Sequence, residues 1–198
     1  MDALEAIKTR RSVGLVSDKA VPKELIEEIL EAGTWAPSHF KTEPWRFTVL
    51  TGSGRKLLGD LLADIAEGEM ENPKTESNQK KLEKQKQKPF RAPLIIAAAV
   101  EPSDNPKVIL SEEYAAVNAA IQNMLLAVHA LGLGAIWRTG KPCYDMRMKK
   151  LFHLSDKGEL LGFIYIGYPT KEISQGKREH YNKKTAWISD EAQFNFKD

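Results

Sequence analysis

Apolar residues recur at helical spacing over a long central stretch of the chain. Between residues 111 and 131 they lie three and four positions apart for about five turns. Ser111 is a suitable N-cap residue, and Glu112 and Glu113 place negative charge in the first turn, where the helix dipole favours it. We therefore expect a long, mostly apolar helix that forms the spine of the domain.

Shorter segments have the periodicity of further helices and of strands. Helical spacing predicts helices at residues 2–10, 22–33, 55–66 and 144–152. Gly33 is placed to cap the second of these helices. Alternating aromatic and β-branched residues, or continuous apolar runs, predict strands at residues 45–51, 93–100, 135–138 and 160–168. Because helices and strands are mixed without regular βαβ alternation, the expected class is α+β.

The chain is expected to form one domain over residues 1–198. Its length is sufficient to bury a core, and no internal repeat is visible. Residues 67–92 are strongly charged and lack a regular apolar face, so we expect a surface excursion that is partly helical. Residues 170–198 are polar with isolated aromatic residues such as Trp187 and Phe194. A tail of this composition is expected to pack on a partner subunit.

Composition excludes several classes of protein. The formal net charge is only +2, so no global field draws the chain to nucleic acid or to a membrane. The one cysteine, Cys143, cannot form an internal disulfide, which fits a reducing compartment. The N-terminus lacks the basic and apolar regions of a signal peptide, and no apolar run is long enough to span a bilayer. These features predict a cytoplasmic protein.

Residues suited to a phosphorylated ligand follow the first predicted helix. Arg10 and Arg11 each offer a planar fork of donors that matches phosphate oxygens, and Ser12 adds a hydroxyl donor. In an extended turn, one guanidinium can reach a phosphate while the other reaches a pyrimidine-like edge. Taken alone, the pair fits a solvated surface better than a binding site, because most arginines are exposed.

Two other segments are suited to the wall of a site for a flat ligand. The loop at residues 34–44 presents Trp35 and His39, and its prolines restrict the backbone. A packed connector is the alternative for this loop. Trp137, Arg138 and Thr139 stand at the end of a predicted strand, a common ligand position, although a surface turn fits them equally well.

Other chemistries have little support. Gly52–Gly54 lacks the third glycine of a dinucleotide-binding loop. The four histidines have no metal-ligand spacing, so no metal site is expected. Residues 80–91 hold six basic residues against one acid, but only Phe90 could stack on a base, so a solvated face is favoured over nucleic-acid binding. No nucleophile elbow or Cys/His pair predicts acyl transfer.

Four segments, in order, resemble the nitroreductase family, and more specifically its small NAD(P)H nitroreductase branch. They read MDALEAIKTRRS, EAGTWAPSHFKTEPWRF, PFRAPLIIAAAV, and GLGAIWRTG with GFIYIGYP, and they cover most of residues 1–169. The resemblance implies a nitroreductase-like fold with a central mixed, mostly antiparallel sheet flanked by helices. It also implies an obligate homodimer that binds FMN at the subunit interface.

The resemblance assigns roles to the residues singled out above. One subunit would supply Arg10, Arg11 and Ser12 to the FMN phosphate, ribityl chain and pyrimidine edge. The same subunit would add a second group by the same end of the cofactor, namely Trp137, Arg138 and Thr139. The other subunit would supply Trp35 and His39 to the flavin. Gly14 stands where larger relatives carry a basic residue near the flavin ring.

The implied activity is the reduction of nitroaromatics, quinones or similar small acceptors with NADH or NADPH. No side chain is expected to be catalytic, since the flavin N5 receives the hydride and solvent can supply protons. A guanidinium of Arg10 or Arg11 would stabilise the negative charge of the reduced ring near N1 and O2. One flavin face that serves both substrates predicts ping-pong kinetics.

Three alternatives stay open from the residues. A flavin-dependent dehydrogenase or reductive dehalogenase could use the same scaffold, because fold and cofactor do not decide the acceptor. A flavin store or sensor would bind FMN with negligible turnover of NAD(P)H. A small RNA-binding module would use residues 80–91, and its binding would fall steeply with salt.

Overall fold

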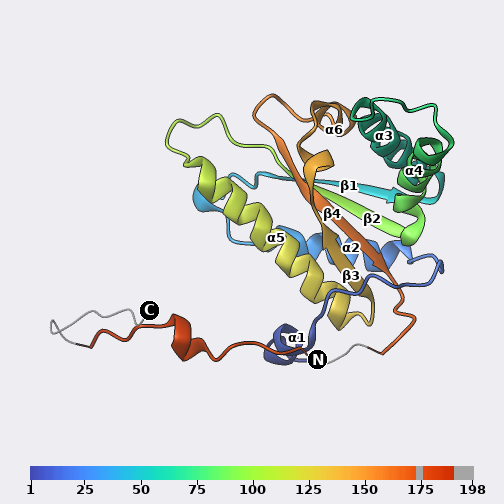
Figure 1. Ribbon diagram of the computed structural model, residues 1–198. Coiled ribbons are helices and arrows are strands. Elements are labelled where there is room, and N and C mark those ends of the chain that lie inside the picture. Colours follow the sequence, from blue (N-terminus) through green and yellow to red (C-terminus); the bar gives the residue numbers. More distant parts are fainter. Residues whose placement is uncertain (173–175, 190–198) are drawn as a thin grey trace.

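The computed structural model describes residues 1–172 and 176–189 of the chain. Helices lie on both faces of one four-stranded sheet (Figure 1). The helices are α1 (Ala3–Thr9), α2 (Lys23–Thr34), α3 (Arg55–Gly68), α4 (Glu76–Gln87), α5 (Leu110–Ala130) and α6 (Met146–Leu151). The strands are β1 (Trp45–Thr51), β2 (Leu94–Val100), β3 (Gly134–Arg138) and β4 (Glu159–Gly167). The α+β class is confirmed, and each predicted strand lies within one residue of an observed one.

The strands follow the order β1-β2-β4-β3, and all three pairings are antiparallel. The parallel contribution is a single bridge between Ser12 and Ala135 of β3. Strand β2 is buried along its whole length because helices cover both faces of the sheet, which explains its continuous apolar run. The edge strands are β1 and β3, and the outer side of β3 is partly covered by the segment that follows α1.

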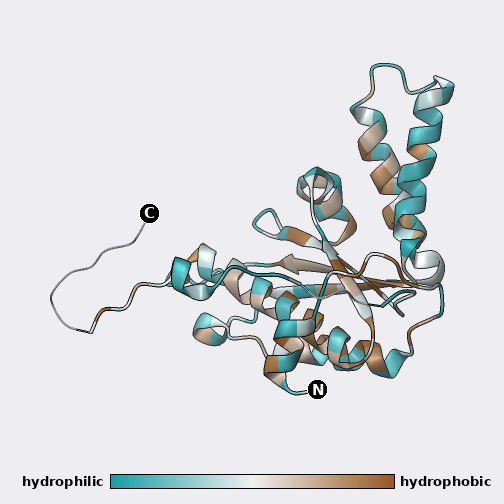
Figure 2. Ribbon diagram, turned by 60° about the horizontal axis from the view of Figure 1, so that its bottom comes forward, coloured by the Kyte–Doolittle hydropathy of each residue, from teal (hydrophilic) through white to brown (hydrophobic). Residues whose placement is uncertain are grey.

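Alternate residues of the central strands serve two separate cores. Ile96 and Ile164 face α2 and α5, whereas Ile95 and Tyr165 face α3 and α6. Helix α1 packs on α5, and α4 packs on α3 (Figure 2). The two cores hold β3 and β4 rigidly between them, which matters for the site described below.

Two details of the helix ends differ from expectation. The prediction that Gly33 caps α2 is wrong, since the helix continues to Thr34. A Cβ at Gly33 would lie 3.0 Å from Met124 Cγ, so this glycine instead lets α2 approach α5 closely. The prediction that Ser111 caps α5 is also wrong, because the helix begins at Leu110 without a side-chain cap.

The charged residues 67–92 contain α4 and the 3₁₀ helix η3 (Lys88–Arg91). Helices α3 and α4 pack side by side and stand away from the sheet (Figure 2). Leu82 is the buried residue of α4. The chain then returns through η3 directly into β2, so the end of this excursion lies next to the centre of the sheet.

The C-terminal segment leaves the sheet after β4. Residues 177–189 run away from the body of the chain as an extended arm that includes a short 3₁₀ helix (Figure 1). Trp187 is 81% exposed and Ile188 is 65% exposed. Phe194 lies outside the described residues, and packing of this tail on a partner stays a prediction. Within residues 1–172 and 176–189, no helix combines the length and apolar character needed to span a membrane.

Candidate functional site

The segment that follows α1 runs beside the edge strand β3. Ser12 bridges Ala135, and the backbone N–H of Val13 donates to the Ala135 carbonyl at 2.8 Å. A Cβ at Gly134 would lie 2.8 Å from Val13 Cγ1, so this glycine permits the close approach. The two groups of residues predicted for one end of the cofactor, 10–12 and 137–139, are therefore brought to the same edge of the sheet.

Helix α1 is fastened to the far end of α5 by one polar contact. Thr9 Oγ1 lies 2.8 Å from Nε2 of His129, and the Thr9 hydroxyl donates to the Glu5 carbonyl at 2.7 Å. Because the hydroxyl proton is used for Glu5, His129 Nε2 is the donor to Thr9. Burial lowers the pKa of His129, and the charges of Arg10 and Arg11 lower it further.

Three arginines gather where α1 ends. Burial lowers the pKa of Arg10, and the neighbouring charges of Arg11 and Arg178 add to the effect. The Nη1 group of Arg11 donates to the carbonyls of Lys8 and Arg10 at 2.8 and 2.6 Å, while its Nε is buried without a hydrogen-bond partner. Among the described residues, none of the three arginines is in an ion pair with a carboxylate. This concentration of charge without a counterion is typical of an anion site.

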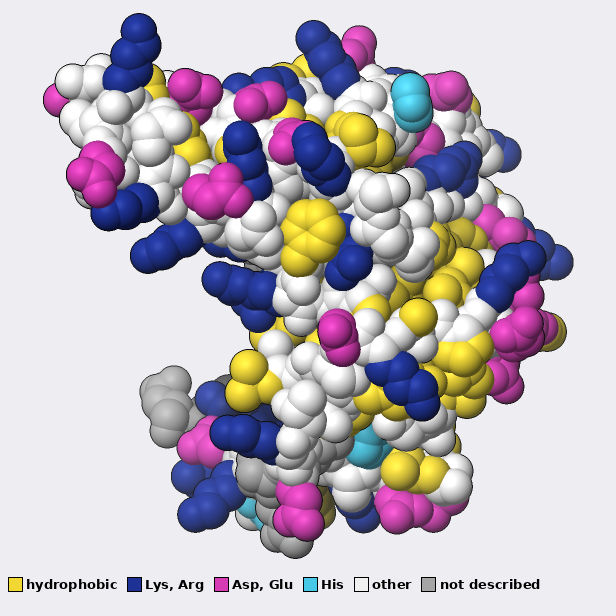
Figure 3. All heavy atoms as spheres, turned by 90° about the vertical axis from the view of Figure 1, so that its right-hand side faces the viewer, with side chains coloured by type: hydrophobic (Ala, Val, Ile, Leu, Met, Phe, Trp, Pro, Cys, Tyr) yellow, Lys and Arg dark blue, Asp and Glu magenta, His cyan; other side chains and the backbone are white. Residues whose placement is uncertain are grey.

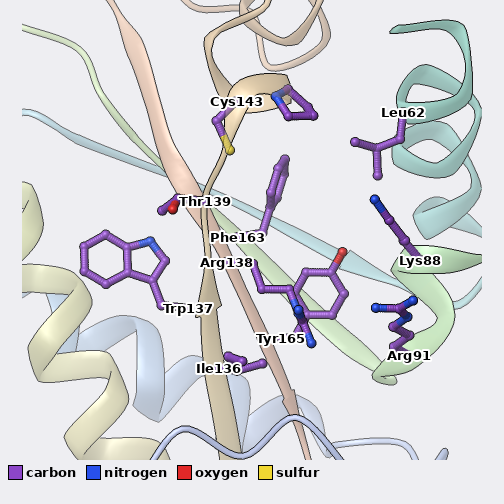
Figure 4. Close-up of a pocket in the computed structure, with 11 residues that line it drawn as sticks. Leu62, Lys88, Arg91, Ile136, Trp137, Arg138, Thr139, Cys143, Phe163 and Tyr165 are labelled. Atoms are coloured by element: carbon purple, nitrogen blue, oxygen red, sulfur yellow. The ribbon is translucent and has the colours of Figure 1, made fainter. Parts of the chain in front are cut away.

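A second group of cations lines a cavity of about 340 Å³ on the other side of β3. Arg138 shares this cavity with Lys88 and Arg91, which point toward it from η3 (Figure 4). Burial lowers the pKa of Lys88, and the charges of Arg91 and Arg138 lower it further. The Arg138 guanidinium carbon lies 5.4 Å from the centre of the Tyr165 ring, and its Nε is buried without a hydrogen-bond partner.

No carboxylate is among the residues that line this cavity. Its floor is apolar and aromatic, formed by Phe163, Tyr165 and the buried thiol of Cys143, whose pKa burial raises to about 11. In the space-filling view, Lys and Arg side chains border a hollow of the surface on both sides (Figure 3). A flat ligand with an electron-rich polar edge fits this combination of aromatic floor and cationic rim.

Trp137 also lines the cavity, and its indole lies on the opposite side of β3 from the Arg138 side chain (Figure 4). Its Nε1 donates to the Leu161 carbonyl at 3.1 Å. Gly162 has φ +140°, and a Cβ there would lie 2.5 Å from Trp137 Nε1, so only glycine leaves room for the indole. Thr139 follows at the exposed end of the strand. Trp137 is thus held rigidly as one wall of the β3 edge.

The predicted residues Trp35 and His39 are not part of this edge within one chain. Trp35 follows α2, is 78% exposed, and lies beside Ala6 of α1 and Ala130 of α5. His39 Nδ1 pairs with Glu112 in the first turn of α5, whereas Arg10 and Arg11 adjoin His129 in its last turn. Glu112 and His129 are seventeen residues apart on one helix, which corresponds to about 25 Å. His39 is therefore separated from Arg10 and Arg11 within one chain, whereas Trp35 lies near the end of α5 that these arginines adjoin.

Lys88 and Arg91 are site residues that sequence reasoning missed. Their basic stretch has the composition of a solvated face, and most of it is solvated along α4. The signal that could have found them is position, because the stretch ends immediately before the most apolar strand of the chain. A cation at that point lies beside the sheet rather than in bulk solvent.

The profile of the nitroreductase family matches residues 7–168, which include both cation groups of the β3 edge apart from Arg178. The chain belongs to the nitroreductase family. The resemblance of its four sequence segments is thus confirmed over most of its length. Membership of the nitroreductase family accounts for the antiparallel sheet with helices on both faces.

Relatives of this nitroreductase-family chain match over nearly their whole length. The protein named Putative NAD(P)H nitroreductase YdjA of Escherichia coli K12 is 34% identical over 176 residues, which cover 88% of this chain and 92% of the relative. The crystal structure of a nitroreductase-like family protein from Bacillus cereus is 32% identical, with a TM-score of 0.80 and coverage of 96% and 97%. A Desulfovibrio desulfuricans protein, described as a nitroreductase in complex with FMN, is 28% identical with a TM-score of 0.68 and coverage of 98% and 99%.

Proposed function

We propose that this chain is an FMN-dependent NAD(P)H oxidoreductase that reduces small acceptors such as nitroaromatics or quinones. The observation that carries the proposal is the β3 edge, where two cation groups without carboxylates flank a rigid strand. A phosphorylated ligand with an electron-rich ring edge complements both groups. The names of the relatives and the FMN complex of a structural neighbour support the same cofactor and reductant.

The residues present fit FMN. The guanidinium groups of Arg10 and Arg11, with Arg178 beside them, suit the phosphate. Ser12 adds a hydroxyl next to them. Arg138, with Lys88 and Arg91, suits the pyrimidine edge of the isoalloxazine. When bound, FMN supplies two-electron redox chemistry between NADH or NADPH and the acceptor.

The chain contributes charge and position to this chemistry. The cations around Arg138 stabilise negative charge on a ring edge beside them, and burial makes each charge more effective than it is in water. Gly14 lies beside this arrangement, since a Cβ there would be in ordinary contact with Arg138 Nη2 at 3.6 Å. Arg138 can thus supply the basic group near the flavin ring, although Gly14 has no side chain to do so. Protons are taken from solvent, which reaches the end of β3 at the exposed residues Trp137 and Thr139.

We infer that the working unit is a homodimer with one cofactor site at each end of the interface. The two ends of α5 lie about 25 Å apart, which is too far for His39 and Arg10 of one chain to contact the same flavin. A second copy can supply His39 and Trp35 to the site that Arg10, Arg11 and Ser12 begin. The exposed apolar residues of α1 and of the C-terminal arm, including Leu4 and Trp187, support an interface of this kind.

The decisive test compares FMN affinity in the wild type and in the double variant Arg10→Ala/Arg11→Ala. Charge-assisted hydrogen bonds contribute about 1.5–3 kcal/mol each, so we expect the Kd for FMN to rise at least about 100-fold. The matched control is Lys74→Ala/Lys81→Ala, which removes two exposed positive charges of the α3–α4 hairpin and leaves the Kd within about twofold. An unchanged Kd in the arginine variant would refute this site.

Four further measurements separate the proposed activity from its alternatives. The flavin absorbance of purified protein bleaches on anaerobic addition of NADPH or NADH if the chain is an oxidoreductase, and it persists with both if the chain is a store or sensor. Parallel initial-velocity lines support the ping-pong scheme, and intersecting lines contradict it. A monomeric mass of the FMN-loaded protein in sedimentation contradicts the shared site. Acceptor screening with pre-reduced protein distinguishes nitro and quinone compounds from organohalides.

A further inference from the structure

The loop that carries His39 has an unusual backbone. Phe40, Lys41 and Glu43 have φ values of 54°, 54° and 48°, so three residues with side chains adopt the left-handed conformation within four positions. Each such residue costs on the order of 1 kcal/mol and persists only when surrounding contacts hold it. The loop therefore depends on contacts from elsewhere in the chain.

The first turn of α5 supplies these contacts through two adjacent carboxylates. Glu113 is 1% exposed, and it accepts hydrogen bonds from Thr42 Oγ1 at 2.5 Å and from the Ser103 N–H at 3.0 Å. Glu112 lies one residue earlier and pairs with Nδ1 of His39. Glu113 thus holds the loop through Thr42, whereas the Glu112 carboxylate has the imidazole as its polar side-chain partner among the described residues.

The imidazole of His39 is held in two directions. Its ring stacks on Phe40 with 4.2 Å between centroids and an angle of 15° between planes. The Glu112 carboxylate fixes Nδ1 as the donor, which leaves Nε2 as the free ring nitrogen. The side chains of His39 and Glu112 are 54% and 38% exposed, so the pair adds little to the stability of the fold. Its arrangement matters to whatever meets the exposed ring.

We propose that Glu112 is a positioning residue for the cofactor site, because its carboxylate orients His39 so that Nε2 faces the flavin bound mainly by the neighbouring subunit. The inference rests on the proposed function, in which His39 is supplied across the dimer interface. Glu112 touches neither flavin nor acceptor and acts only through the imidazole. Its adjacent partner Glu113 keeps the strained loop folded, so the two carboxylates divide backbone support from ring orientation.

A double-mutant cycle tests this inference. We measure the Kd for FMN in the wild type, His39→Ala, Glu112→Ala and the combined variant. Both single variants raise the Kd about tenfold, and the combined variant raises it no further, because the carboxylate has no effect once the ring is absent. Glu112→Gln keeps a hydrogen-bond acceptor for Nδ1 and retains affinity within about threefold of the wild type. A merely structural role for Glu112 would not produce this dependence on His39.

The control is Glu24→Ala, which removes an exposed carboxylate from the first turn of α2 and leaves the Kd unchanged. The inference is overturned if Glu112→Ala weakens FMN binding equally with and without His39, or if it has no effect. A wild type that does not bind FMN removes the proposed function itself. If the wild type binds FMN and the double-mutant cycle shows no coupling between Glu112 and His39, only the role of Glu112 is removed.

Discussion

Single residues of the β3 edge owe their positions to one glycine on the neighbouring strand. Gly162 occupies the region of positive φ, next to the place where the pairing of β2 and β4 shifts register between Ala98 and Ala99. The indole of Trp137 takes the space that a side chain at Gly162 would fill. The irregularity is therefore the feature that seats Trp137 and, through the strand backbone, Arg138.

Replacing this glycine is expected to disturb both stability and cofactor binding. In Gly162→Ala, the new methyl group would lie 2.5 Å from Trp137 Nε1 and 2.6 Å from the Arg138 carbonyl oxygen, so the edge strand must shift. We expect a loss on the order of 3 kcal/mol in the free energy of unfolding, together with weaker FMN binding. Urea unfolding and flavin titration measure the two effects, and a variant as stable as the wild type would contradict the tight seat.

His129 makes stability depend on pH in a stated direction. Burial and the nearby arginines lower its pKa in the folded chain from an ordinary value of 6.5. Between the folded and the unfolded pKa the unfolded chain binds more protons, so stability falls as the pH decreases below about 6.5. In His129→Gln, which keeps a donor for Thr9, this contribution is absent. We expect the difference in unfolding free energy between wild type and variant to shrink as the pH falls; a difference that grows in acid would contradict the lowered pKa.

At the scale of elements, the α3–α4 hairpin is built around one close crossing. A Cβ at Gly59 would overlap the carbonyl oxygen of Lys86 and lie 3.2 Å from its carbonyl carbon. Both contacts are with backbone, which cannot rotate away. Because Lys88 follows only two residues later, the crossing also determines where η3 presents its cations.

The variant Gly59→Ala is expected to push α4 off α3 and cost about 1–3 kcal/mol of stability. Gly68→Ala is a matched control in the same helix, since the nearest atom to its added Cβ is a mobile guanidinium nitrogen of Arg147 at 4.0 Å. Alanine there should change stability by less than about 1 kcal/mol. Urea unfolding of both variants checks the contrast, and equal stabilities would argue against the close crossing.

Elements were predictable where the pattern is local. The spacing of apolar residues was sufficient for α5, and the unbroken apolar run was sufficient for β2. Helix ends were less predictable. Gly33 and Ser111 are residue types that often cap helices, but Gly33 packs against Met124 inside α2 and α5 begins one residue before Ser111, at Leu110. Local patterns carry no information about these tertiary contacts.

The same limit applies to the site. The pairing of residues 10–12 with 137–139 could be expected from the family resemblance, and the bridge from Ser12 to Ala135 brings them together. Lys88 and Arg91 could not be recognised from composition, which is the same for the solvated helix α4, and only their position just before the buried strand β2 distinguishes them. The charge of Glu113 was expected at a helix start, but its burial under the His39 loop depends on the path of a distant segment.

At the scale of the whole molecule, a site shared between copies predicts complementation. One variant lacks Arg10 and Arg11, and the other lacks His39. The residues removed lie at opposite ends of α5. When the two are mixed and allowed to exchange subunits, a mixed dimer holds one site with all residues intact. We expect activity to reappear in the mixture although each parent is impaired. Absence of recovery after subunit exchange, confirmed by mass measurement, would contradict a shared site.

The length of α5 also links cofactor retention to protein concentration. Because a single copy offers its arginines and its imidazole at places about 25 Å apart, each half holds the flavin with only part of the contacts. Dilution that separates the copies would then release flavin, and added flavin would draw the copies together by mass action. Flavin that passes a dialysis membrane after dilution, but stays with the protein at high protein concentration, would be the sign of that coupling.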